Sequence, residues 1–149
     1  MTGFLVAVVL VVAFVWGQMT LLRPSRRDQR LMGLRTEARR LGLHARLLAP
    51  PDWYRGDKPR GGLLACYSVL TGDEEKGLPY FLAERLSDGE WVVRQGIKAA
   101  LPSLPGTAVR WAGLEARANT LSVWWAEEGE ESDLLDMLVV LAQLREKLS

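Results

Sequence analysis

Two residue types on which much enzyme chemistry depends are nearly absent from this sequence. Among 149 residues there is one histidine, His44, and one cysteine, Cys66. A lone cysteine cannot form an internal disulfide, which favours a reducing compartment. We interpret His44 as a residue at a helix end or strand edge and Cys66 as a small core residue. A Cys66–His44 pair stays open as an alternative, because the two side chains could meet in the folded domain.

The common catalytic and ligand-binding motifs are absent as well. The sequence has no phosphate-binding GxxxxGK[ST], no GxGxxG after a strand, no HExxH and no CxxC. The acidic cluster at 127–133 lacks the spacing of a calcium loop, and we interpret it as a solvated loop followed by a helix N-terminus. We therefore predict a protein that is not an enzyme, with no catalytic residues, no metal site and no cofactor.

A strong net charge is also missing, since 19 Lys/Arg and 18 Asp/Glu give a formal net charge of +1 at pH 7. The charge is nevertheless uneven: residues 23–60 carry eleven basic and four acidic residues, whereas residues 61–149 carry eight and fourteen. A nucleic-acid-binding protein would carry basic residues more uniformly. We expect no nucleic-acid partner, but a basic stem close to a membrane and an acidic distal part.

What the sequence does contain is an uncharged apolar run over residues 3–22, followed at once by arginines. A helix needs roughly 20 apolar residues to cross the hydrocarbon core, so the run is long enough. The alternative is a cleaved signal peptide, which usually has a basic residue before its apolar core. Here no basic residue precedes the run, and the basic exit opposes export. We therefore assign residues 1–23 as a transmembrane anchor.

The arginines after the run predict its orientation; they are Arg23, Arg26, Arg27 and Arg30. Basic residues near the end of a span stay cytoplasmic, and the tail before the run has no charged side chain. We expect a single-pass protein of the bacterial inner membrane, in a Gram-negative cell, with a periplasmic N-terminus and a cytoplasmic C-terminal domain. The four arginines would lie at the membrane surface, against the anionic lipids of the inner leaflet.

Residues 24–42 follow as a basic amphipathic segment, with a helix expected over 25–42. Ser25 can cap its N-terminus, and Gly42 can end it. One apolar stripe, at spacings of three and four, comprises Leu31, Leu34, Ala38 and Leu41. Two hypotheses remain for this stripe: it packs on the sheet of the domain, or it lies along the membrane surface.

Residues 43–149 are predicted to form a cytoplasmic α+β domain that includes a proline- and glycine-rich loop at 49–62. The period-two pattern predicts strands at 63–70, 80–86, 90–95, 108–115 and 120–126, a further candidate at 43–48, and turns at 72–77 and 87–89. A helix is predicted at 132–148, with core positions Leu134, Met137, Leu141, Leu144 and Leu148, and with Leu135, Leu138, Val139 and Ala142 widening its apolar side. The expected fold is α+β: an N-terminal transmembrane helix followed by a small antiparallel sheet packed with two helices on one face.

Tryptophan is abundant, with six in the chain and five of them outside the anchor. Strand alternation places Trp125 in the core and Trp124 on the opposite face of the sheet. Because Trp and Arg are enriched in binding hot spots, we predict a partner-binding patch on an exposed sheet face that comprises Trp124, Arg94 and Arg110. The alternative is that arginine stems cover Trp124 on an ordinary solvated sheet.

Residues 21–30, LLRPSRRDQR, followed by Leu31 and Leu34, resemble the juxtamembrane stretch of the YajC family. The resemblance covers roughly residues 4–42. It implies a small accessory subunit of the bacterial Sec translocase with an outside N-terminus, one span, a basic helix and a small cytoplasmic domain. After residue 42 the chain departs from that family, with a proline-rich loop and a longer, tryptophan-rich domain.

These observations predict a non-enzymatic, single-pass inner-membrane protein that presents a cytoplasmic protein-interaction domain. The resemblance narrows this to an accessory subunit of a membrane or translocase complex with a membrane-protein partner. The alternative is a membrane-tethered enzyme or small-ligand sensor with a pocket between the sheet and the C-terminal helix. No oligomeric state is predicted.

Overall fold

The computed structural model of the chain describes residues 1–72 and 77–149. The chain divides into two compact units, Met1–Gly33 and Leu34–Ser149. The boundary between the two units lies inside the helix Arg26–Arg40, whereas the sequence predicts residues 24–42 as a single segment. Most of the acidic turn predicted at 72–77 lies outside the described residues.

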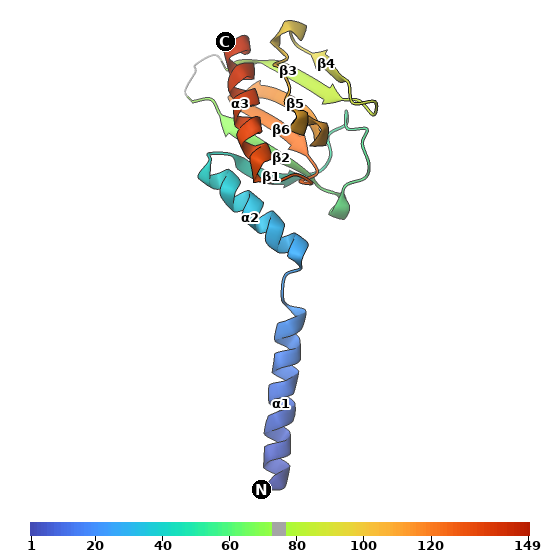
Figure 1. Cartoon of the computed structure of the whole chain (residues 1–149), viewed down its shortest axis with the longest axis vertical. Coiled ribbons are helices and arrows are strands. Elements are labelled where there is room, and N and C mark those ends of the chain that lie inside the picture. Colours follow the sequence, from blue (N-terminus) through green and yellow to red (C-terminus); the bar gives the residue numbers. More distant parts are fainter. Residues whose placement is uncertain (73–76) are drawn as a thin grey trace. The chain divides into compact units, whose positions relative to one another are not determined.

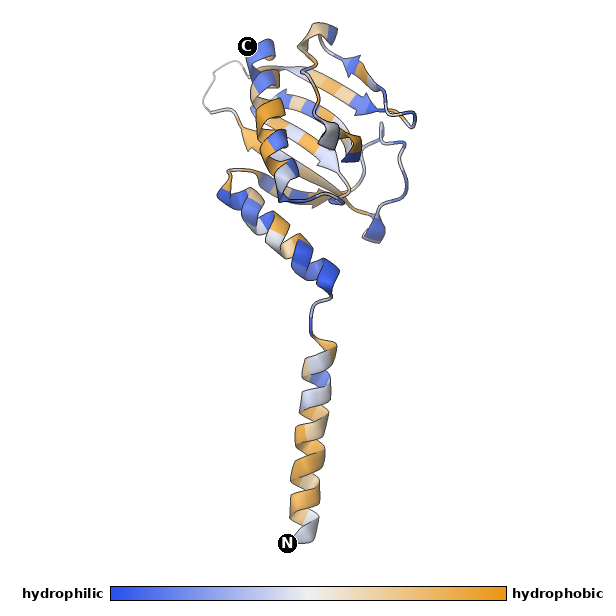
Figure 2. Ribbon diagram, viewed as in Figure 1, coloured by the Kyte–Doolittle hydropathy of each residue, from blue (hydrophilic) through white to orange (hydrophobic). Residues whose placement is uncertain are grey.

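The first unit begins with helix α1, Thr2–Leu21, which has no buried residue. Figure 2 shows it as a mostly apolar helix. Within the described residues it is the one helix whose length and composition suit a membrane span, and a signal sequence near an N-terminus would have the same properties. The structure therefore supports one apolar N-terminal helix that is either a span or a signal sequence.

Helix α2, Arg26–Arg40, starts and stops where the sequence predicts. The Ser25 hydroxyl accepts a hydrogen bond from the backbone N–H of Asp28 at 3.1 Å, and the Asp28 carboxylate accepts one from the backbone N–H of Ser25. This reciprocal pair is a capping box, which satisfies N–H groups that the first turn leaves open. At the other end Gly42 adopts φ +88°, a conformation that favours glycine and stops the helix.

The second unit is built on one six-stranded antiparallel sheet with the strand order β1-β2-β6-β5-β3-β4 (Figure 1). Its strands are β1 His44–Leu48, β2 Leu64–Leu70, β3 Leu78–Arg85, β4 Trp91–Gln95, β5 Trp111–Ala118 and β6 Thr120–Trp125. The helix α3, Glu131–Leu148, packs on one face of the sheet. The candidate strand at 43–48 therefore exists, and the predicted α+β fold is confirmed.

The main core lies between the sheet and the two helices. Leu34 and Ala38 of α2 are buried in the same cluster as the sheet residues Tyr67, Trp111 and Trp125. Residues 34–40 of α2 therefore pack on the domain, as the first of the two hypotheses for the apolar stripe requires. The five predicted core positions of α3 are all buried, whereas Leu135 and Val139 are each 56% exposed. Leu135 and Val139 belong to the apolar side predicted from the sequence, but they lie outside the stripe of α3 that packs on the sheet.

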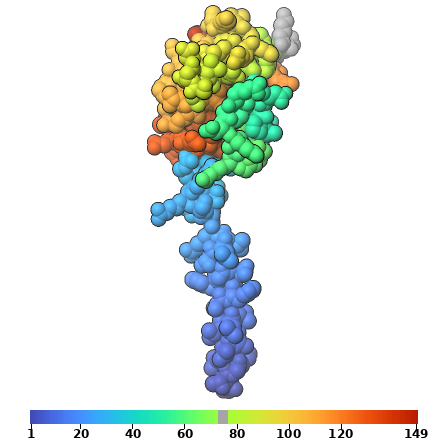
Figure 3. Space-filling model, turned by 90° about the vertical axis from the view of Figure 1, so that its right-hand side faces the viewer, coloured from blue at the N-terminus to red at the C-terminus, as the bar shows by residue number. Residues whose placement is uncertain are grey.

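The opposite face of the sheet carries a second, smaller apolar cluster of Leu64, Cys66 and Trp124. Trp53 and Tyr54, from the loop between β1 and β2, pack against it. Figure 3 shows this segment, in teal and green, on the surface of the domain beside β3 in yellow-green. Gly113 makes the close packing possible, because a Cβ there would overlap the ring of Trp53 and lie 3.0 Å from the carbonyl oxygen of Ala83.

The start of the strand predicted at 108–115 differs from expectation. Residues Gly106–Arg110 form a 3-10 helix, η3, and β5 begins only at Trp111. Pro105 has no N–H for a strand ladder, and its carbonyl accepts the hydrogen bond from Ala108 that closes the turn. As a result Val109 is exposed, whereas alternation in a continuous strand would place it on the same face as the buried Trp111. Two further 3-10 turns are η1 Arg60–Gly62 and η2 Lys98–Ala100.

Candidate functional site

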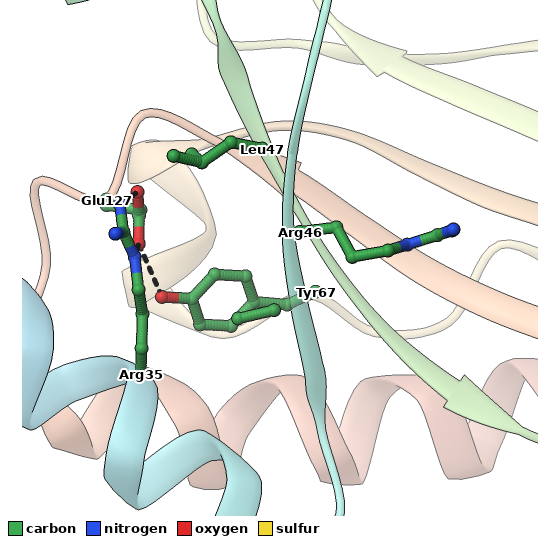
Figure 4. Close-up of a pocket in the computed structure, with 6 residues that line it drawn as sticks. Arg35, Arg46, Leu47, Tyr67 and Glu127 are labelled. Carbon is green, nitrogen blue, oxygen red and sulfur yellow. Dashed lines mark hydrogen bonds and ion pairs between the residues drawn. The ribbon is translucent and has the colours of Figure 1, made fainter.

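The most distinctive polar feature of the domain is a cluster of Arg35, Tyr67 and Glu127. Each side chain comes from a different element: Arg35 from α2, Tyr67 from β2 and Glu127 from the turn after β6. Leu34 and Ala38 bury one side of α2 and so direct Arg35 to the margin of that contact. Figure 4 shows the three side chains converging on the helix side of the sheet. We call them the Arg35 cluster.

The geometry of the Arg35 cluster is that of a fully engaged carboxylate. Arg35 donates from Nε to Oε2 of Glu127 at 2.8 Å and from Nη2 to Oε1 at 2.7 Å. The hydroxyl of Tyr67 donates to Oε2 at 2.6 Å. A two-bonded arginine–carboxylate contact is both stronger and more directional than a single bond. Because Glu127 is only 5% exposed, these contacts replace the water that it would otherwise bind.

Packing and backbone hold the cluster in place. Tyr67 is completely buried, and its ring meets that of Trp125 edge to face with centroids 5.3 Å apart. Glu127 has φ +59°, a conformation that side-chain-bearing residues seldom adopt. Such a conformation persists only where its surroundings impose it. Here the two hydrogen bonds from Arg35 and the adjacent end of β6 impose this conformation on Glu127.

The electrostatics favour one fixed protonation state. Burial, and then the hydrogen bond to Glu127, raise the pKa of Tyr67 well above its ordinary value of about 10. The same carboxylate raises the pKa of Arg35. Tyr67 therefore stays a donor and Arg35 stays charged throughout the physiological range. The cluster thus joins the three elements that carry it. A general acid or base needs a pKa near the working pH, and Arg35 and Tyr67 do not meet that requirement.

A pocket of about 240 Å³ adjoins the cluster. It is lined by Arg35, Ala45, Arg46, Leu47, Tyr67 and Glu127. It thus lies beside α2 and the edge strand β1, and not at the position between the sheet and α3 that the enzyme or sensor hypothesis requires. Figure 4 shows the side chain of Arg46 pointing to the opposite side of β1 from Leu47 and Glu127.

The structure does not bring the three predicted partner-binding residues onto one exposed face. Trp124 does lie opposite the main core, as strand alternation predicts, but it is only 6% exposed, because the loop 49–62 covers it through Trp53. Arg94 shares that face and is bonded to Glu84 at 2.9 and 2.6 Å. Arg110 lies on the helix side, where it binds Asp133 at 2.9 and 2.5 Å. The predicted shared patch is therefore wrong, and partner binding by the two arginines stays a separate prediction.

The predicted membrane-surface arginines belong to the first unit. Arg23 precedes α2, and Arg26, Arg27 and Arg30 lie in its first turns. Arg23, Arg26 and Arg30 are exposed and Arg27 is half-buried. Their arrangement around the start of the helix is compatible with a position at a lipid surface, which stays a prediction.

His44 and Cys66 lie on neighbouring strands, two positions apart in register. His44 is exposed on β1, as a strand-edge residue should be, and Cys66 is buried in the smaller cluster. Burial raises the pKa of the Cys66 thiol, which disfavours the reactive thiolate. Over residues 1–72 and 77–149, no three His, Cys, Asp or Glu side chains gather as metal ligands would.

Sequence analysis missed the Arg35 cluster because its members are far apart in the chain. It also placed Glu127 and Asp133 in a solvated acidic segment, whereas both are buried against an arginine. One signal was present: Tyr67 lies in the most apolar predicted strand, and a buried tyrosine hydroxyl requires a polar partner. That partner could not be identified without the tertiary structure.

Comparison with known proteins identifies no relative: no protein family, no curated protein and no solved structure matches the chain.

Proposed function

We propose that this chain is a non-enzymatic, single-pass membrane protein that holds a cytoplasmic protein-interaction domain close to the bilayer. The observation that carries the proposal is the construction of α2. Its first turns bear Arg26, Arg27 and Arg30, immediately after an apolar helix of 20 residues, and its later turns are part of the core of the domain. The later turns of α2 are thus attached to the domain itself.

The Arg35 cluster supplies that attachment. Only residues 22–25 separate α1 from α2, and four residues extend over about 14 Å at most. A domain tethered in this way stays near the surface in which α1 is embedded. This short tether suits a module that meets other membrane proteins better than one that searches the cytoplasm.

The basic flank of α1 supports a specific orientation and location. We propose a periplasmic N-terminus, a cytoplasmic domain and the inner membrane of a bacterium, with the arginines against anionic lipid. The resemblance of residues 4–42 to the YajC juxtamembrane stretch supports a narrower proposal, a role as an accessory subunit of a membrane or translocase complex.

Topology is tested with reporters fused after Ser149 in the full chain. Alkaline phosphatase fused there should be inactive and green fluorescent protein should be fluorescent. The matched variant replaces Arg23, Arg26, Arg27 and Arg30 by glutamine, which should raise the phosphatase activity. An active phosphatase on the unaltered chain, or a mature N-terminus beyond residue 22 by mass spectrometry, would overturn the proposal.

The interaction role needs a separate test in intact cells. A photo-crosslinking amino acid is placed at single exposed positions of the domain, for example Leu47, Leu135 and Val139. We expect one identified membrane protein to be recovered from at least one position and not from the equivalent domain lacking α1. Absence of any crosslinked protein at all exposed positions would contradict an interaction domain.

A further inference from the structure

The edge strand β1 is an unusually open element of this domain. It pairs with β2 over five residues without interruption, and among the strands of residues 1–72 and 77–149 it has no partner on its other side. An open edge presents backbone N–H and C=O groups to which another extended chain can bind. Leu47, on this strand, is 43% exposed, which is unusual for a leucine at a free sheet edge.

The two sides of β1 differ in chemistry. Ala45 and Leu47 point toward the pocket beside the Arg35 cluster, whereas His44 and Arg46 point to the opposite side of the strand. Arg35 and Glu127 neutralise one another, so the pocket offers an apolar wall and a neutral polar end. Its volume of about 240 Å³ suits one side chain better than a whole small-molecule ligand.

The opposite side of β1 is cationic. Arg46 and His44 are exposed there, and Arg46 has no ion-pair partner in the part of the chain that the structure describes. A strand added beside β1 would alternate between these two environments, since successive side chains of a strand point to opposite faces. Charge complementarity calls for acidic residues on the Arg46 side and apolar residues on the Leu47 side.

The other free edge of the sheet is closed to such a partner. The pairing of β4 with β3 shifts in register between Leu82 and Ala83, and a shift of this kind bends an edge away from regular pairing. Arg94 on β4 is already bonded to Glu84. The strand β1 has neither protection.

A second copy of this chain is a poor occupant of the β1 edge. An antiparallel pair of β1 strands centred on Arg46 would set the two Arg46 side chains directly opposite one another. Like charges in that position are destabilising. The chemistry therefore favours a different chain over a symmetric dimer.

We propose that β1 is a docking edge for an extended segment of a partner protein in which acidic residues alternate with apolar residues. The segment adds a seventh strand, with its apolar side chain in the pocket at Leu47 and its carboxylates against Arg46 and His44. This inference rests on the proposed function of the domain as an interaction module, and it adds the surface and the chemistry of the partner.

The test uses the full chain in phospholipid nanodiscs and fluorescently labelled seven-residue peptides. The binding probe alternates glutamate with valine; one control alternates lysine with valine, and another has proline at the central valine. We expect the glutamate–valine peptide alone to bind, and the amide protons of His44–Leu48 to gain protection from hydrogen exchange on binding.

Two charge-reversal variants make the test specific. Arg46→Glu should lower the affinity for the glutamate–valine peptide about tenfold and allow the lysine–valine peptide to bind. Arg117→Glu makes the same charge change at an exposed residue of β5 and should leave both affinities within about twofold. Folding of both variants is checked by tryptophan fluorescence.

Four results would overturn the proposal: no binding of the glutamate–valine peptide, equal binding of the proline peptide, an Arg46→Glu variant that binds like the unaltered chain, or binding without protection of β1. Protection of β1 that rises with protein concentration, without peptide, would instead assign the edge to a second copy. None of these results alters the reporter or crosslinking experiments, so failure of this edge is distinguishable from failure of the proposed function.

Discussion

Removal of Arg35 tests whether the Arg35 cluster attaches α2 to the domain. In Arg35→Leu the methylene packing is largely kept, while Glu127 loses its bidentate partner and retains the hydroxyl of Tyr67. Breaking a buried ion pair from one side costs about 3–5 kcal/mol. Because 33% of the Arg35 side chain is exposed, solvent reduces this loss, and we expect about 2–3 kcal/mol.

The loss is measured by urea unfolding of the full chain in detergent micelles, followed by tryptophan fluorescence. For a domain of this size the same loss should lower the melting temperature by about 8–12 °C. The matched control is Arg39→Leu on the exposed side of the same helix, which should change the free energy of unfolding by less than about 0.5 kcal/mol.

A double variant separates the ion pair from general damage to α2. Arg35→Leu combined with Glu127→Gln removes both charges of the bidentate contact, and the glutamine still accepts a hydrogen bond from Tyr67. It should therefore be more stable than Arg35→Leu alone by about 1–2 kcal/mol. If Arg35→Leu unfolds like the Arg39→Leu control, or if the two substitutions are simply additive, the Arg35 cluster does not hold the helix in the way we infer.

Two further predictions follow from the buried side chains. The raised pKa of Tyr67 keeps its hydroxyl protonated in the folded state, whereas the tyrosine of the unfolded chain titrates near pH 10. The contribution of Tyr67 to the free energy of unfolding should therefore be constant below about pH 10 and fall by up to about 1.4 kcal/mol per pH unit above it. In urea titrations Tyr67→Phe should make the decline above pH 10 less steep, and an unchanged slope would contradict the prediction. Gly113→Ala should displace Trp53 and weaken the contact of its loop with the sheet by about 1 kcal/mol. The rate of alkylation of Cys66 should then rise about fivefold. Gly106→Ala, where a Cβ would meet open space, should leave this rate unchanged.

Sequence patterns predicted those elements whose causes are local. The N-cap at Ser25, the stop at Gly42 and the buried stripe of α3 each depend on residues within a few positions of one another. The same holds for strand alternation, which correctly placed Trp124 and Trp125 on opposite faces. These features could be read from spacing alone.

The errors arose where a distant segment determines the environment of a residue. Trp124 was expected to be exposed because nothing in its own strand covers it, but the loop carrying Trp53 does so over Gly113. Arg110 was placed in a strand, whereas the turn that starts at Pro105 directs it to Asp133. No periodicity encodes contacts of this kind, because they depend on how the loops close.

The two hypotheses for α2 turn out to concern different parts of one helix. Leu34 and Ala38 are buried in the core of the domain, so this part of the apolar stripe is not available to lipid. Arg26, Arg27 and Arg30 lie in the turns before that contact, in the unit that also holds α1, and the lipid contact that we propose concerns these turns. The helix α2 is therefore basic in its first turns and packed on the domain in its later turns. Tyr67 on the strand next to β1 and Arg35 on α2 share the carboxylate of Glu127, so the Arg35 cluster links the neighbour of the β1 edge directly to α2.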